Sequence, residues 1–240
     1  MTPSPATGQF WLGMRMFLPV AISIAAYGVV WGVLAGQAGM SVLEVAAMSA
    51  LVFAGASQFV VLEMWTPGHL PIASIVVATA IVNLRVLLMT ATLRPLTTHL
   101  TRPRALIAMF FVADENWAMT MGEVARGRGS VAFLLGSGVL SWFAWAGSTL
   151  VGRVLGAFID DPTRYGLDFA FTATFLALLL GMWKGRGDVV PWVAGALIAI
   201  VTSRLVEGNW YTIAGGLGGS LAGAVFDQWW ERRRVSSDAA

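Results

Sequence analysis

The most constraining feature of this chain is a series of long apolar runs that carry few charges. They cover residues 17–36, 42–61, 70–93, 131–159, 167–182, 189–205 and 211–226. A transmembrane helix needs about 20 mostly apolar residues, because that length crosses about 30 Å of hydrocarbon. The runs do not alternate between apolar and polar residues, so we expect helices rather than the strands of a membrane barrel. The sequence therefore predicts an all-α, polytopic bundle embedded in the lipid bilayer.

The composition supports the same class. Of the 240 residues, 57% are hydrophobic and 12% are charged, whereas a soluble domain carries about 25% charged residues. A net charge of +2 is too small to indicate nucleic-acid binding. The chain has no cysteine, which excludes disulfides and thiolate metal sites. We expect a polar N-terminal segment at 1–16, one transmembrane domain at 17–229 and a basic cytoplasmic tail at 230–240, without metal or cofactor.

Small and polar residues interrupt the second run. Positions 53–59 read FAGASQF, which places Gly55, Ala56, Ser57 and Gln58 inside an otherwise apolar helix. Such a sequence unwinds a helix, and the half-helix that follows presents free N–H groups and a positive dipole end to an anion. Secondary transporters bind substrate carboxylates at broken helices of this kind. The alternative is a kinked but continuous helix in which Gln58 bonds to a neighbour.

A charged residue lies inside the run at 70–93. Arg85, with Asn83 two positions earlier, stays protonated and needs an acidic partner, a carbonyl group or an anionic ligand. Its planar fork fits a carboxylate. The alternative is that Arg85 extends to the membrane surface near Arg94, ~13 Å further along a helix. We take Asn83 and Arg85 as candidate substrate-binding residues.

An eighth run, 106–121, is apolar at both ends but carries Asp114, Glu115 and Asn116 at its centre. Ionisable groups at membrane depth are costly and mark functional sites. Asp114 or Glu115 could pair with Arg85, receive an ammonium group or exchange a proton. The alternative is an interfacial bend that holds both carboxylates beside the arginines at 126 and 128.

Loop charges bear on how this run lies. Arginine groups at 94–104 and at 126–128 should both be cytoplasmic by the positive-inside rule, yet one run separates them. Either 106–121 does not cross the membrane, or one group lies on the opposite side.

Glycines recur every four residues in the first and last runs, a spacing that lets helices approach closely. They serve either internal packing or a docking face for a separate membrane subunit. The two stripes are Gly28, Gly32 and Gly36, and Gly215, Gly219 and Gly223.

The residues favour a protein that is not an enzyme. Ser57 has no evident base, because His69 and His99 both lie outside the apolar runs. No zinc-protease, P-loop or dinucleotide motif is present either. We therefore assign no catalytic residue.

These motifs resemble those of the AzlC family of branched-chain amino acid permeases, over about residues 18–227. The segment 53–59 is similar to the family's (Y/F)AGASQF signature, residues 83–86 to its (N/D)xRH stretch and 113–115 to its TDE stretch. Residues 175–177 followed by 184–186 match further along. Val86 stands where many members have histidine and Ala113 where many have threonine, which puts coupling and specificity in question.

The resemblance implies a function. Members of the family work with a short hydrophobic partner of the AzlD type. They export leucine, isoleucine, valine and sometimes methionine across the bacterial inner membrane.

Our hypothesis is that the carboxylate of a zwitterion meets Arg85 and the break at 55–58, while its ammonium meets Asp114 or Glu115. A zwitterion enters a low-dielectric site only when both charges are matched. We expect transport to be coupled to proton entry. The alternatives are a membrane-embedded binding or assembly subunit, and an exporter of another small zwitterion or organic anion. Assembly into a homo-oligomer is also open.

Overall fold

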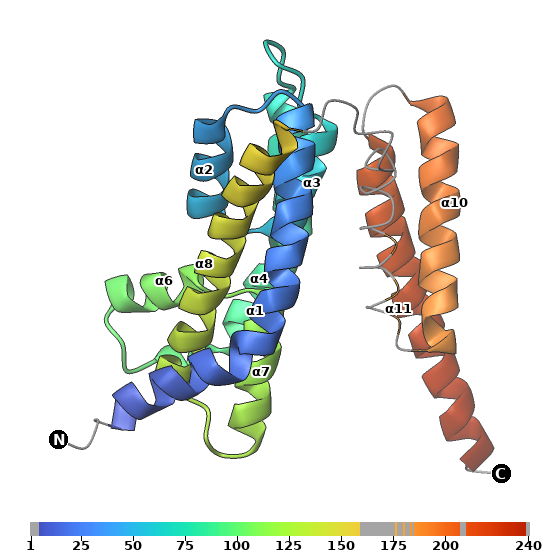
Figure 1. The fold of residues 1–240 in the computed structure, drawn as a ribbon. Coiled ribbons are helices and arrows are strands. Elements are labelled where there is room, and N and C mark those ends of the chain that lie inside the picture. The colour runs from blue at the N-terminus through green and yellow to red at the C-terminus, as the bar shows by residue number, and fades with distance from the viewer. Residues whose placement is uncertain are drawn as a thin grey trace. The chain divides into compact units, whose positions relative to one another are not determined.

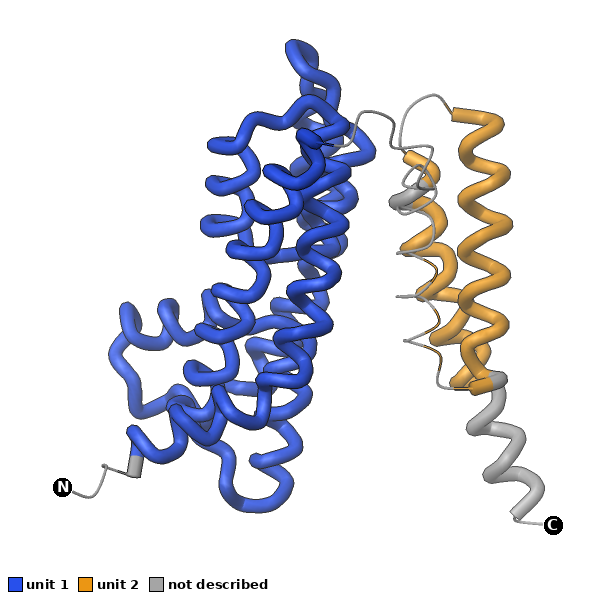
Figure 2. The backbone as a smooth tube through the Cα atoms, viewed as in Figure 1, with its two compact units in different colours: residues 1–168 blue, residues 169–240 orange. Residues whose placement is uncertain are grey.

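The structure, a computed structural model, describes residues 5–158, 185–206 and 210–238, with Leu176, Leu180 and Trp183 as isolated positions. Within these ranges every regular element is a helix and none is a strand. The chain divides into two compact units, residues 1–168 and 169–240 (Figure 2). Apart from Leu176 and Leu180, the expected run at 167–182 lies outside the described residues, and so does the motif position 184.

Figure 1 shows the helices of both units. The first unit contains α1 (Pro5–Gln37), α2 (Val42–Leu51), α3 (Gly55–Glu63), α4 (Ile72–Thr92), α5 (Arg94–Thr97), α6 (Arg102–Phe110), α7 (Asp114–Ala125) and α8 (Val131–Gly156). The second contains a short turn η2 (Arg186–Asp188), α10 (Val189–Leu205) and α11 (Trp210–Asp238).

Three of the described helices, α1, α4 and α8, are long and apolar enough to cross a membrane, and α2 and α10 are shorter apolar helices. The predicted all-α membrane fold is therefore confirmed. Helix α1 begins at Pro5, so residues 5–16 of the expected polar N-terminal segment are helical.

Helices α1 and α8 pack backbone against backbone at their glycines. A methyl group built on Gly32 would collide with the carbonyl of Thr149, and one on Gly152 with the carbonyl of Val29. Close approaches of the two helices recur at Gly13, Gly28, Gly136 and Gly156. Because small residues let helix backbones touch, we regard α1 and α8 as one rigid pair. Internal packing is thus confirmed for the first glycine stripe.

The glycine stripe of α11 also packs internally, within the second unit. A methyl group on Gly215 would lie 2.9 Å from the carbonyl oxygen of Gly195 in α10, and one on Gly219 would lie 2.7 Å from that of Pro191. Gly223 faces the Pro191 ring. This stripe is therefore covered by α10 and does not need a separate subunit.

The second apolar run is broken where the sequence predicts, and the break turns the chain back. Phe53, between α2 and α3, has a φ of 42°, a left-handed conformation that is uncommon without glycine. The turns that precede α2 and follow α3 lie together, since a methyl group on Gly39 would be 3.1 Å from Cγ of Pro67. The run at 42–61 therefore enters and leaves at one end of the unit, rather than crossing as its length suggested (Figure 1).

The eighth run is broken as well, between Phe110 and Asp114. Both ends of this second hairpin, α5 to α7, lie where α1 begins. Gln9 of α1, Pro95 of α5 and Ser130 before α8 line one groove there. The run at 106–121 therefore does not cross, and Arg94 and Arg128, which adjoin Pro95 and Gly129 of this groove, lie at the same end.

The two hairpins enter the first unit from opposite ends and meet at their tips. The rings of Phe53 and Phe110 lie 6.2 Å apart between centroids. Helix α8 runs past both tips: Trp142 Nε1 donates to the carbonyl of Ala50 (3.0 Å), and Gly138 lies against Phe111. The pattern of a long helix followed by a hairpin therefore occurs twice, once as α1 with α2–α3 and once as α4 with α5–α7. The two copies run in opposite directions.

Candidate functional site

The tip of the first hairpin exposes a helix N-terminus without a cap. Ala54 is the N-cap of α3, and no side chain in the described part of the chain hydrogen-bonds there. The first turn of a helix leaves its N–H groups without intrahelical partners, which here means Gly55, Ala56 and Ser57. Ser57 is buried, and its Oγ finds no partner among the described residues. These donors and the helix dipole form a site suited to an anion.

Gln58 lies in the same turn but is already engaged. Trp145 Nε1 on α8 donates to Gln58 Oε1 (2.7 Å), and Gln58 Nε2 donates to Oγ of Ser49 on α2 (3.3 Å). Thr149 on α8 donates to the same Ser49 oxygen (2.9 Å). All four side chains are buried. The helix is therefore broken, and Gln58 bonds to neighbours, so each of the two readings of this segment describes part of the structure.

The tip of the second hairpin carries an ion pair. Arg85 Nη1 on α4 lies 3.1 Å from Asp114 Oδ2 at the first residue of α7, and the side chains are 41% and 46% exposed. Arg85 thus has an acidic partner, as one of the predicted possibilities required. Two further atoms here, Arg85 Nε and Asn83 Oδ1, are buried and have no partner within the described ranges. The pair is open enough for a solute to reach and retains unused donors and acceptors.

Asn116 holds the second break, a role that the sequence did not assign. Its Oδ1 accepts from the N–H of Ala113 and its Nδ2 donates to the carbonyl of Phe111, each at 2.7 Å. Asn116 is fully buried, whereas its neighbour Glu115 is on the exposed face of α7. The usable signal was position: Asn116 is the third helical residue, from which a side chain reaches back to the N-cap N–H.

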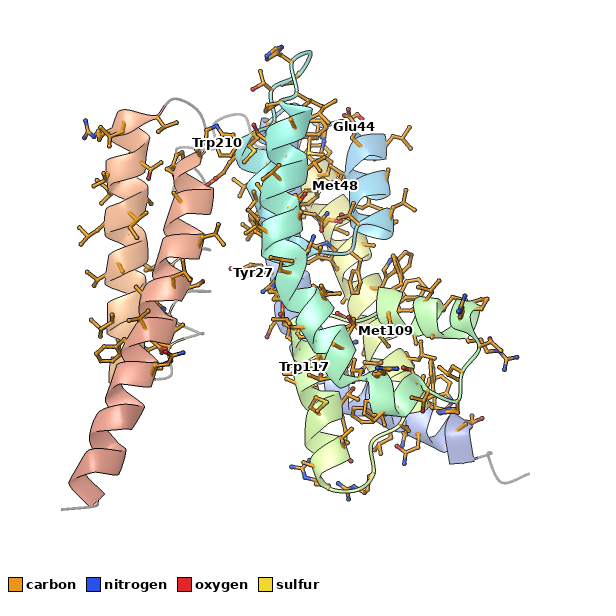
Figure 3. All side chains as sticks on the ribbon, turned by 180° about the vertical axis from the view of Figure 1, so that it is seen from behind. Tyr27, Glu44, Met48, Met109, Trp117 and Trp210 are labelled. Carbon is orange, nitrogen blue, oxygen red and sulfur yellow. The ribbon has the colours of Figure 1, made fainter. Side chains whose placement is uncertain are left out.

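Trp117 ties the same hairpin to α4. Its Nε1 donates to Oγ1 of Thr92 (2.9 Å), at the C-terminal end of α4, and Figure 3 shows Trp117 projecting from α7. Together with the Arg85–Asp114 pair, this bond fastens α7 to α4 at two points.

The candidate residues thus fall into two groups at the two touching tips. Gly55, Ala56, Ser57 and Gln58 lie at the α3 terminus, and Asn83, Arg85, Asp114 and Glu115 lie around the α4–α7 contact. Within residues 5–158, no hydrogen bond or ion pair of the described side chains joins the two groups directly. The sequence did not single out three residues of the hydrogen-bond network around Gln58, which are Ser49, Trp145 and Thr149. The available signal was that each carries a hydrogen-bonding group within an apolar run.

Discontinuous helices that meet at charged groups within an apolar bundle are the arrangement found at the substrate sites of secondary transporters. The chain belongs to the AzlC family, because the model of that family, described as AzlC protein, matches residues 19–159.

Similar proteins are known from bacteria and archaea. An uncharacterized membrane protein of Archaeoglobus fulgidus is 29% identical, over 93% of this chain and 96% of its own. The inner membrane protein YgaZ of Escherichia coli is 29% identical over 83% of this chain and 85% of its own. The branched-chain amino acid transport protein AzlC of Bacillus subtilis is 23% identical, over 85% and 82% respectively. No solved structure matches.

Proposed function

We propose that this chain is the large subunit of a secondary transporter that exports branched-chain amino acids across the bacterial inner membrane. Leucine, isoleucine and valine are the proposed substrates, with methionine as a further one, and the partner is a small hydrophobic protein of the AzlD type. The Arg85–Asp114 ion pair and the bare α3 terminus, in hairpins whose tips touch through Phe53 and Phe110, carry the proposal. The name of the Bacillus subtilis relative supports the substrate class.

The ion pair matches the charges of an α-amino acid. Without substrate, Arg85 and Asp114 neutralise each other across 3.1 Å. A zwitterion that enters between them gives its carboxylate to Arg85 and its ammonium to Asp114, so no charge is left unmatched in a low-dielectric site. The N–H groups of the α3 terminus and the Ser57 hydroxyl supply further donors to the carboxylate, and Asn83 Oδ1 supplies an acceptor to the ammonium.

Gln58 has a positioning role in this proposal. Its amide oxygen accepts from Trp145 and one of its two amide N–H groups donates to Ser49, so it holds the α3 terminus and keeps one N–H donor for the substrate. Glu115, on the exposed face of α7, is the group proposed to take up the coupling proton.

The opposed hairpins suit alternating access. Each hairpin reaches the site from a different end of the unit, so retraction of one tip at a time would open the site to one side of the membrane. The long pair α1 and α8 would remain in place, because their backbones are in contact.

The test is efflux from proteoliposomes that contain the chain, with and without the partner, and are loaded with labelled leucine. We expect saturable efflux with the partner present, with competition from valine and isoleucine but not from organic anions or cationic amino acids. Arg85→Gln should lower it by about 100-fold, since the charged hydrogen bonds to the substrate carboxylate are lost. The matched control is Arg94→Gln on exposed α5, which should leave efflux unchanged.

Three outcomes oppose the proposal. If Arg85→Gln leaves efflux unchanged, Arg85 is not part of the substrate site. Preference for organic anions would change the solute. No flux under any condition, despite assembly with the partner, would make the chain an assembly subunit.

A further inference from the structure

The indole of Trp145 lies against the first turn of α3. A methyl group built on Gly55 would lie 3.2 Å from Cη2 of Trp145, so the ring edge rests against the bare backbone of that glycine. One turn later, the indole N–H bonds to the Gln58 amide. Residues three apart share a helix face, so a single side chain of α8 contacts both ends of the turn whose N–H groups form the anion site.

The bonds around Gln58 fix its amide in one orientation. The indole N–H is a donor only, so the atom facing it at 2.7 Å must be the amide oxygen. The amide nitrogen then faces Ser49 Oγ, which also accepts from Thr149. A flipped amide would set donor against donor at Trp145 and leave the buried group unsatisfied, at a substantial cost. Gln58 therefore connects the half-helices α2 and α3 to each other and to α8 through one fixed geometry.

The hydrogen bonds of Gln58 tie the anion site to α8, which belongs to the rigid pair of α1 and α8. Helix α8 is in backbone contact with α1, whereas Arg85 lies on α4 and is bonded to α7. A substrate carboxylate that bridges the α3 N–H groups and Arg85 needs a set distance between them. The contacts of Trp145 with Gly55 and Gln58 determine the position of the α3 N–H groups, which is one end of that distance.

We infer that Trp145 is a positioning residue for substrate: it acts through Gln58 to hold the N-terminus of α3 at the place where the substrate carboxylate binds. This inference rests on the proposed function for its substrate. It assigns to α8, which carries no candidate binding residue, control over affinity.

The experiment compares Trp145→Phe with Trp31→Phe in the full chain with its partner, in proteoliposomes. Phenylalanine keeps a ring at position 145 but removes the bond to Gln58, so we expect the KM for leucine efflux to rise on the order of tenfold and the maximal rate to change less than twofold. Trp31 is equally buried, and its Nε1 has no partner in the described part of the chain. The ring of Trp31 lies 6.3 Å from that of Trp145 between centroids. Trp31→Phe keeps an aromatic ring there and loses no hydrogen bond, so it controls for the loss of indole volume in this cluster and should leave KM near that of the wild type.

A double-mutant cycle with Gln58→Met separates positioning from general packing. If Trp145 acts through the amide, Trp145→Phe adds nothing to the KM of Gln58→Met. Additive effects, or a KM of Trp145→Phe equal to that of the wild type, would overturn the inference.

Amide hydrogen exchange supplies a readout that does not need transport. Trp145→Phe should speed exchange at Gln58, whose N–H bonds to the carbonyl of Ala54, and in the rest of α3 (Gly55–Glu63), relative to wild type and to Trp31→Phe, without changing exchange in α7. Unchanged exchange of these hydrogen-bonded amides would overturn the positioning role. Absence of flux from the wild type would instead count against the proposed function, while the exchange result still decides whether Trp145 holds α3.

Discussion

Arg85 and Asp114 interact with each other before any substrate arrives, and this sets what a substitution of either does. Arg85→Gln or Asp114→Asn leaves one charge of the pair without its partner. The double variant removes both charges and restores neutrality. We therefore expect each single variant to lower stability by about 0.5–1 kcal/mol, the range of a partly exposed pair, and the double variant to recover most of it.

Transport should behave differently from stability in this series. Because both charges contact the zwitterion, leucine efflux should stay low in the double variant. Thermal unfolding in detergent and efflux from proteoliposomes measure the two effects side by side. A double variant that regains efflux would show that the pair is structural and not part of the site.

Glu123, near the end of α7 and outside the apolar runs, makes a pH-dependent contribution to stability. Hydrogen bonds from Arg128 and then Arg126 hold the pKa of its buried carboxyl below the ordinary value of 4.5. A depressed pKa gives stability that is present above the unfolded pKa and lost as the pH falls through the folded one.

Wild type should therefore melt at a higher temperature than Glu123→Gln at pH 7, and the difference should shrink below pH ~4.5 as the folded carboxyl becomes protonated. Arg128→Gln should lose much of the same stability at pH 7. Melting curves between pH 7 and pH 3.5 test this. A difference that is constant over this range would contradict the assignment.

At the residue scale, the sequence predicted which residues need a polar or charged partner. It did not predict partners that are distant along the chain. An arginine in an apolar run requires a partner, which made Asp114 and Glu115 candidates, and the structure pairs Arg85 with Asp114. Nothing local connects Gln58 with Trp145, 87 positions away, or Ser49 with Thr149, 100 positions away. Tryptophan and threonine in an apolar run look like ordinary lipid-facing or packing residues until the helices are placed together.

At the scale of elements, the glycines of α8 give a matched pair of positions on one helix. Gly152 meets the backbone of Val29 in α1, whereas a methyl group on Gly147 meets nothing within 4 Å in the described residues. In a helix, alanine is favoured over glycine by about 1 kcal/mol. Gly147→Ala should therefore stabilise the protein slightly.

Gly152→Ala should destabilise by about 1–3 kcal/mol, as overpacking does, because backbone cannot move aside as a flexible side chain can. Thermal unfolding of the two variants in the same detergent measures both. Equal effects would mean that α1 and α8 are not in backbone contact in the membrane.

The same scale shows what hydropathy can and cannot predict. The small and polar residues at 53–59 identified the first break, since they lower helix propensity inside an apolar run. That the chain reverses there was not predicted, because apolar content is the same for a crossing and a returning segment. The reversal depends on the left-handed Phe53 and on the contact between the two turns at Gly39 and Pro67. For 106–121, the loop arginines kept a non-crossing segment among the possibilities.

At the scale of the whole molecule, the two hairpins make a prediction about sidedness. The chain has no native cysteine, so single cysteines can be placed freely. His99 and Ala125 flank the second hairpin. Single cysteines that replace them should react with a membrane-impermeant maleimide from the same side. A cysteine at His69, after the first hairpin, should react from the opposite side (Figure 1).

Intact cells and inverted vesicles, labelled in parallel, distinguish the sides. The arginine-rich end should be the cytoplasmic one by the positive-inside rule, with the N-terminus there too. Labelling of positions 99 and 125 from opposite sides would mean that 106–121 crosses the membrane and that the hairpin is wrong.

The pairing of α1 with α8 also has a consequence for biosynthesis. Arg153 of α8 donates to the carbonyl of Met40, just beyond the end of α1, and the two residues are separated by 113 positions. At about 5–20 residues per second, synthesis of that interval takes roughly 6–23 s. During this time the glycine face of α1 is exposed to lipid. Helix α8, against which both hairpins pack, is not yet present. The ribosome must therefore release most of the first unit before the pair of α1 and α8 can form.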